Sequence, residues 1–132
     1  MAFTFQKEER LCSRRLIDQL YSEGHRLMAF PFSVQWMAVE DFTHGRCQVM
    51  IVAPKRKFKH AVERNHVRRL TRECYRLRKD RLYRFLSEQG IGIVFSMVYV
   101  HNEIMPYDQL SHKMDKLLAA LESDIEKMKS EK

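Results

Sequence analysis

The chain has 132 residues, 45% of them apolar and 11% aromatic, and a formal net charge of +7. This length suits a single domain with one buried core, and the apolar content excludes a disordered basic tail. We expect one folded domain over residues 1–132, with an ordered core of about residues 8–125 and a frayed C-terminal tail.

The cysteines and the hydropathy pattern restrict the cellular context. Cys12, Cys47 and Cys74 are widely spaced and include no Cys-x-x-Cys pair that would hold zinc or a redox disulfide. No apolar run approaches the roughly 20 residues of a transmembrane helix, and the N-terminal MAFTFQKEERL lacks the apolar core of a signal peptide. The sequence therefore predicts reduced thiols, no metal site on the protein and a cytoplasmic location without a membrane partner.

The N-terminal part is predicted to form a helix followed by two strands. The helix covers about residues 13–23, with Ser13 as its N-cap and Gly24 as its stop signal. Its apolar side chains recur at helical spacing: Leu16, Ile17, Leu20 and Tyr21. Residues 32–38 alternate between apolar and polar, which is typical of a half-buried strand. After the EDFTHG turn, RCQVMIVAP predicts a second strand, antiparallel to the first and ended by its proline.

The rest of the chain is predicted to contain a helix, a strand and a last helix. Residues 55–86 return to helical period, with an apolar face formed by Val67, Leu70, Cys74 and Leu77. IVFSMVYV, residues 93–100, is typical of a central strand covered on both faces. Asp108 is a suitable N-cap for the last helix, whose polar end EKMKSEK is expected to fray. This order predicts an α/β sandwich, with helices packed on a small mixed sheet.

Positive charge is concentrated in one segment of the chain. Between Lys55 and Arg84 there are 13 Lys or Arg and three acidic residues, a net of +10, whereas the rest has 11 basic against 14 acidic residues. A concentrated positive field supports salt-sensitive binding to phosphate backbones. The patch therefore favours nucleic acid as the partner, although an anionic membrane surface suits it too.

The arginines of this segment share one face of the predicted helix. With Arg64 at 0° and 100° per residue, that face lies between about 0° and 140°, away from the apolar stripe. Its members are Arg64, Asn65, Arg68, Arg69, Arg72 and Arg76. A merely solvated face usually mixes signs, because like charges four residues apart repel by about a few tenths of a kcal/mol each. A phosphate backbone offsets this repulsion, since each guanidinium binds phosphate oxygens in a forked geometry.

The string AVERNHVRRLTRE, residues 61–73, resembles the signature of the protein subunit of bacterial ribonuclease P. That signature is an Arg-Asn pair followed by a basic doublet and a further Arg on one helix. EERLCSRRLIDQLYSEGHRL resembles the opening helix of the family, and VAPKRKFKHAVERN resembles its approach from strand to helix. The resemblance extends from about Glu8 to about Leu121.

The resemblance implies an α+β fold of order αβββαβα, with a small mixed sheet and a left-handed βαβ crossover, similar to ribosomal protein S5 domain 2. Such a fold needs a further strand near residues 25–27. The resemblance also implies an endoribonuclease holoenzyme in which a catalytic RNA, using Mg²⁺, removes the 5′ leader from precursor tRNA. The protein would bind the catalytic RNA and the leader, broaden the range of substrates and support activity at low magnesium.

The same resemblance assigns RNA contacts by position. They are Arg64, Asn65, His66, Arg68, Arg69 and Arg72 on the helix, and Lys55, Arg56, Lys57 and Lys59 on the loop before it. Arg64 and Arg68 are expected to bind phosphates, whereas Asn65 orders the preceding loop or contacts RNA. The family commonly has Arg where this chain has His66, and a neutral imidazole weakens the phosphate field.

A second implied surface is a cleft between the first helix and the sheet, which holds the single-stranded leader by stacking bases on aromatic rings. Tyr21 matches such an aromatic position, and Ile17 stands where an aromatic residue is often found. Phe32 and Trp36 either line the cleft or belong to the core, depending on which face of their strand is exposed.

Catalysis by the protein itself and two other classes of binding protein are disfavoured. His60 and His66 are the histidines of the basic segment, and neither lies beside a cluster of acids that would bind metal. A general RNA-binding or ribosomal protein shares the charge pattern but gives no reason for the Arg-Asn spacing. A DNA-binding regulator needs a short helix directly before the basic helix, where strands are predicted instead.

Overall fold

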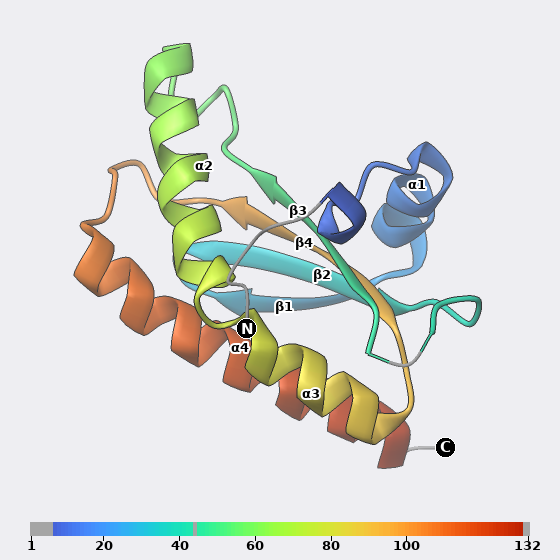
Figure 1. Cartoon of the computed structure of the whole chain (residues 1–132). Coiled ribbons are helices and arrows are strands. Elements are labelled where there is room, and N and C mark those ends of the chain that lie inside the picture. Colours follow the sequence, from blue (N-terminus) through green and yellow to red (C-terminus); the bar gives the residue numbers. More distant parts are fainter. Residues whose placement is uncertain (1–6, 44, 131–132) are drawn as a thin grey trace.

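The computed structural model describes residues 7–43 and 45–130, which form a four-stranded sheet with helices on both faces (Figure 1). In chain order the elements are the 3-10 helix η1 (Lys7–Glu9), α1 (Arg14–Glu23), β1 (His25–Ala29), β2 (Phe32–Ala38), β3 (Cys47–Val52), α2 (Ala61–Arg76), α3 (Lys79–Gln89), β4 (Ile93–Tyr99) and α4 (Tyr107–Ser130). The α+β class is confirmed, and β1 is the further strand that the family resemblance requires.

The strands follow the order β1-β2-β4-β3. β2 is antiparallel to both β1 and β4, whereas β3 runs parallel to β4. The predicted antiparallel pairing of β2 with β3 is therefore wrong, because β4 lies between them. The reason is burial, since β4 is apolar at nearly every position and is stable only where both of its edges are paired and both of its faces covered. β3 joins its parallel neighbour through the crossover that contains α2 and α3.

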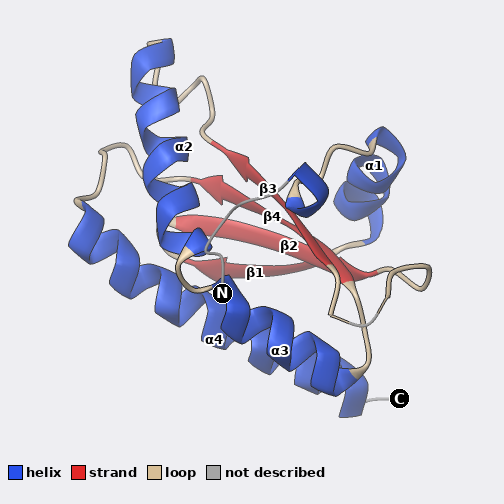
Figure 2. Ribbon diagram, viewed as in Figure 1, coloured by secondary structure: helices blue, strands red, loops and turns tan. Residues whose placement is uncertain are grey.

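The helices divide unequally between the two faces of the sheet (Figure 2). α2, α3 and α4 pack on one face over the larger core cluster, which includes Phe32, Trp36, Tyr75, Phe95 and Leu121. α1 covers part of the other face, over a smaller cluster of Leu11, Leu16, Leu20, Met37 and Val94. β2 is therefore buried on both faces near its C-terminal end, and not half buried as its alternation predicts.

Residues 61–89 form two helices where one was predicted. α2 buries Val67 and Cys74, whereas α3 buries Leu82 and Leu86. On one continuous helix these two pairs would differ in direction by about 100°, so they could not face the same sheet. The break at residues 77–78 removes this conflict by turning α3 toward the core. Leu77, predicted to lie in the apolar face, is exposed because it occupies the break.

The ends of the α4 helix differ from the prediction. It begins at Tyr107, so Asp108 lies in the first turn and is not the N-cap. It continues to Ser130, so helical geometry extends into the polar end EKMKSEK, for which fraying was predicted. Its stripe of buried side chains continues through Ile125, and Met128 packs against the core, which explains the added length. None of the helices in the described residues is both long and apolar enough to cross a membrane.

The segment before α1 is fixed along the outer edge of β3. The backbone N–H of Leu11 donates to the carbonyl oxygen of Val49 at 2.9 Å. The carboxylate of Glu9 accepts hydrogen bonds from Lys79 Nζ at 2.5 Å and from the Tyr83 hydroxyl at 2.9 Å. Both donors belong to α3, so this helix holds the segment that leads into α1.

The three thiols are expected to differ sharply in reactivity. Cys12 is exposed, whereas Cys47 and Cys74 are buried. Burial raises the pKa of Cys47 to about 12, against a smaller lowering by the hydrogen bond with Tyr75, so this thiol stays protonated at pH 8. At pH 8 a thiol reagent should modify Cys12 quickly, and the two buried thiols only after unfolding. Mass spectrometry of the labelled chain measures this, with Cys12→Ser as the control that removes the fast phase; rapid labelling of folded Cys47 would contradict it.

Candidate nucleic-acid interface

The basic loop before α2 is held in place by Arg64. One terminal nitrogen of its guanidinium, Nη1, donates to the carbonyl oxygens of Phe58 at 2.9 Å and Lys59 at 3.0 Å. Phe58 itself is buried and fixes the middle of the loop. Lys55, Arg56 and Lys59 point into solvent, whereas Lys57 is half buried and its Nζ donates to Asn102 Oδ1 at 3.1 Å. Arg64, and not Asn65, therefore orders the loop in this structure.

The outer face of α2 brings the other predicted contacts together. Asn65, His66 and Arg69 are exposed and, with Val62, line a shallow depression of about 330 Å³. The oxygen of the Asn65 side chain accepts a hydrogen bond from Arg68 Nη2, which orients that guanidinium along the helix. His66 therefore shares a surface with Asn65 and Arg69.

Arg72 extends this surface around the edge of the sheet. It is exposed and lies beside a depression of about 180 Å³ that is also lined by Arg10, Cys12 and Met50. Met50 belongs to β3 and packs against the α1 side of the sheet, whereas Arg72 belongs to α2 on the other side. A polyanion at this depression can therefore contact both sides of the sheet at once.

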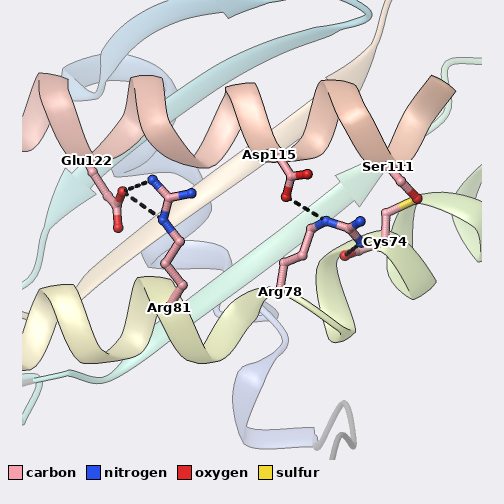
Figure 3. Close-up of polar contacts among 6 residues, drawn as sticks. All are labelled: Cys74, Arg78, Arg81, Ser111, Asp115 and Glu122. Atoms are coloured by element: carbon pink, nitrogen blue, oxygen red, sulfur yellow. Dashed lines mark hydrogen bonds and ion pairs between the residues drawn. The ribbon is translucent and has the colours of Figure 1, made fainter. Parts of the chain in front are cut away.

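Three arginines further along the chain, Arg76, Arg78 and Arg81, are paired with acids instead. Arg78 Nε donates to Asp115 Oδ1 at 2.7 Å, and Arg81 Nη2 donates to Glu122 Oε2 at 2.7 Å, both across to α4 (Figure 3). Arg76 binds Glu73 through Nε at 2.6 Å and Nη2 at 3.1 Å, and this hydrogen bonding holds the pKa of Glu73 below its ordinary value. By contrast, Arg69 and Arg72 form no salt bridge with a described residue. The positive charge open to a partner is thus concentrated between Lys55 and Arg72.

The predicted cleft residues divide into two groups. Tyr21, in the last turn of α1, is 43% exposed, and Ile17 is half buried against the small cluster under α1. Phe32 and Trp36 are wrong as cleft residues, because both are fully buried in the core on the opposite face of the sheet. Trp36 Nε1 also donates to Asp124 Oδ2 of α4 at 2.7 Å, which fixes its ring on that face.

The residues of β2 that alternate with Phe32 and Trp36 face the α1 side of the sheet. Ser33 and Gln35 lie on the same face as Met37, and Gln35 is paired in register with Ser96 of β4. Gln35 is 8% exposed and Ser96 is 1% exposed, yet Gln35 Nε2 and Ser96 Oγ have no hydrogen-bond partner within the described chain. Such groups usually cost about 1–3 kcal/mol each when left unpaired. In the sequence, Gln35 could have been noticed as one of the polar residues that alternate with apolar ones in residues 32–38.

The histidines and acids do not converge on a metal site in the described part of the chain. No group of three or more His, Cys, Asp or Glu side chains there is arranged to hold a metal ion. His60 is exposed at the N-cap position of α2, where its side chain makes no capping hydrogen bond. His66 is exposed on the outer face of that helix.

A small mixed sheet that presents an exposed arginine-rich helix defines the class: an α+β protein suited to bind a polyanion. The family profile described as Ribonuclease P matches residues 5–122, and the chain belongs to this family, with the role of the protein subunit of ribonuclease P. The "Ribonuclease P protein component" of Porphyromonas gingivalis is 28% identical over 123 residues, which cover 93% of this chain and 90% of that one. The same-named protein of Syntrophus aciditrophicus is 34% identical over 91 residues, covering 69% and 71%.

Solved structures agree on the fold. The RNase P protein of Staphylococcus aureus matches with a TM-score of 0.68 at 19% identity, over 87% of this chain and 96% of that one. The RNase P protein of Thermotoga maritima matches with a TM-score of 0.65 at 22% identity, over 83% and 94%. At these identities the likeness supports the fold and says nothing of individual side chains.

Replacing the exposed Arg69 is expected to weaken binding to ribonuclease P RNA without destabilising the fold. Arg69→Ala is expected to remove one phosphate contact, and the slope of log affinity against log salt should then become shallower by about one. Filter binding at several salt concentrations measures this. The matched control is Arg84→Ala, which should leave the slope unchanged. Arg84 is exposed on α3 and lies outside the proposed RNA-binding residues 55–72. An unchanged slope for Arg69→Ala would contradict the assignment.

Proposed function

We propose that the loop at residues 55–59 and the outer face of α2 bind the catalytic RNA of ribonuclease P. The observation that supports this most is the division of the arginines: Arg76, Arg78 and Arg81 are paired with acids, whereas the exposed Arg69 and Arg72 form no salt bridge with a described residue. An exposed guanidinium group can bind two oxygens of one phosphate through two parallel N–H···O hydrogen bonds. Asn65 adds both donors and acceptors next to Arg69.

The open part of the sheet beside α1 is proposed to bind the single-stranded 5′ leader of precursor tRNA. Tyr21 offers an exposed ring for stacking at the end of α1. The neighbouring sheet face carries the half-buried pair Ser33 and Val98, a floor that is partly polar and partly apolar, with the buried Gln35 next to Ser33 on the same face of β2. The depression between Arg10, Met50 and Arg72 joins this floor to α2, so one strand of RNA can follow both surfaces.

In the proposed holoenzyme the chemistry belongs to the RNA, which uses Mg²⁺ to hydrolyse the phosphodiester at the 5′ end of the tRNA. The residues of this chain neutralise phosphates, hold the leader and so favour correct assembly at low magnesium and with a broader range of substrates. The proposed site of action is the cytoplasm.

Cleavage of precursor tRNA tests this proposal directly. A bacterial ribonuclease P RNA from the same source is assayed at low, near-physiological magnesium with and without the folded chain. Accurate 5′ processing is expected only when the chain is added. A general RNA-binding protein would bind the RNA without this stimulation, and absence of stimulation would contradict the proposal.

Tyr21 is expected to contribute to leader binding through stacking. Tyr21→Ala should weaken binding of precursor tRNA to the holoenzyme roughly tenfold, because stacking on an aromatic ring contributes about 1–3 kcal/mol per base. Tyr21→Phe should retain most of the affinity, and binding of mature tRNA should not change in either variant. Tyr107→Ala, an exposed tyrosine on α4, is the control. Equal losses for precursor and mature tRNA would refute a leader contact.

A further inference from the structure

The turn between β1 and β2 exposes an aromatic ring that neither proposed RNA surface uses. Phe30 is 49% exposed, although most large apolar side chains of the chain are buried. Its ring lies 5.1 Å from the ring of His101, centroid to centroid, at an interplanar angle of 58°. His101 follows the end of β4 and is half buried. The exposed Phe30 ring and the half-buried His101 ring thus form a pair at one end of the sheet.

This ring pair stands on a rigid support. The His101 ring lies 6.4 Å from the ring of Tyr99, which is almost fully buried. The Tyr99 hydroxyl donates to the carbonyl oxygen of Glu103 at 2.7 Å and accepts from the backbone N–H of Met105 at 3.0 Å. These two bonds hold the loop after β4. The backbone N–H of Val100 donates to the carbonyl oxygen of Pro31 at 2.8 Å, which ties the turn to the same strand end.

The ring pair is also coupled to the basic loop. The buried ring of Phe58, in that loop, lies 5.8 Å from the ring of Tyr99. Lys57 Nζ donates to Asn102 Oδ1 at 3.1 Å, next to His101 in the chain. These two contacts, Phe58 with Tyr99 and Lys57 with Asn102, connect the loop at residues 55–59, where a phosphate backbone is proposed to bind, to the end of β4 that carries His101.

We propose that Phe30 and His101 form a platform on which an unpaired nucleotide of the catalytic RNA stacks. Aromatic side chains beside a positively charged loop are the arrangement by which proteins hold unpaired bases, because every base has a face that stacks. The inference rests on the proposed function and adds a contact outside the basic helix and the leader surface.

The position of the rings favours the catalytic RNA over the leader. Tyr99, which supports His101, belongs to the core cluster on the α2 and α4 side of the sheet. Phe30 lies in the turn beyond Ala29, the last residue of β1, so the strand register that pairs Met28 with Ser33 on the α1 side does not set its direction. Its side is set by the ring contact with His101. The platform thus continues the surface of the basic loop, at the end of the sheet, and not the floor beside α1.

Affinity for the ribonuclease P RNA of the same source, measured by filter binding over a range of salt, tests the platform. Phe30→Ala should lower affinity roughly tenfold, whereas Phe30→Tyr should bind like the original chain. The slope of log affinity against log salt should stay unchanged in Phe30→Ala, because stacking releases no counterions. Met28→Ala is the matched control, since Met28 is 65% exposed close by but has no ring.

Three results would overturn the platform: unchanged affinity in Phe30→Ala, full affinity in Phe30→Leu, or a loss confined to precursor tRNA binding by the assembled holoenzyme. The last would assign the ring to the leader. Because Phe30→Ala could alter the turn, Phe30→Trp provides an independent test. The fluorescence of the added tryptophan should be quenched when the RNA binds, and unchanged fluorescence would overturn the stacking. Intact stimulation of cleavage by the original chain, with no effect at Phe30, would refute this inference alone and leave the proposed function standing.

Discussion

Burial of β4 on both faces is the constraint on which the rest of the structure depends. Its residues from Ile93 to Met97 are all buried, so helices must cover both sides of the sheet and strands must pair with both of its edges. β2 and β3 occupy those edges, and the parallel direction of β3 makes a helical crossover necessary. α2 is the first half of that crossover. The exposed basic face of α2 is therefore a direct result of how the central strand is buried.

The acids of α4 decide which part of the basic segment remains open. Asp115 and Glu122 bind Arg78 and Arg81 and hold the C-terminal part of the segment against α4 (Figure 3). Exposed ion pairs of this kind add little stability on their own, about 0–1 kcal/mol each. Their larger effect here is on the distribution of charge, because they leave the positive field concentrated at the loop and at Arg69 and Arg72. The same fold can thus stabilise one group of arginines and offer another to a partner.

The sequence predicts the elements of this protein better than their partners. Helical spacing locates α1 and the basic face of α2, and the apolar run locates β4, because these signals are local. The alternation in β2 separates Phe32 and Trp36 from Ser33 and Gln35, but it cannot say which set faces the larger core, since that depends on α4. The pairing of β3 with β4 and the neutralisation of Arg78 by Asp115 likewise depend on residues far along the chain. Long-range contacts of this type have no signal within a local window.

The hydrogen bonds from Arg64 to the carbonyl oxygens of Phe58 and Lys59 order the backbone of the basic loop when the protein folds. Ordering a flexible backbone costs roughly 1–2 kcal/mol of conformational entropy per residue. Because Arg64 and the buried Phe58 already order residues 55–59 in the free protein, this cost belongs to folding and not to association. The positive charges of this loop are therefore arranged before any partner is met.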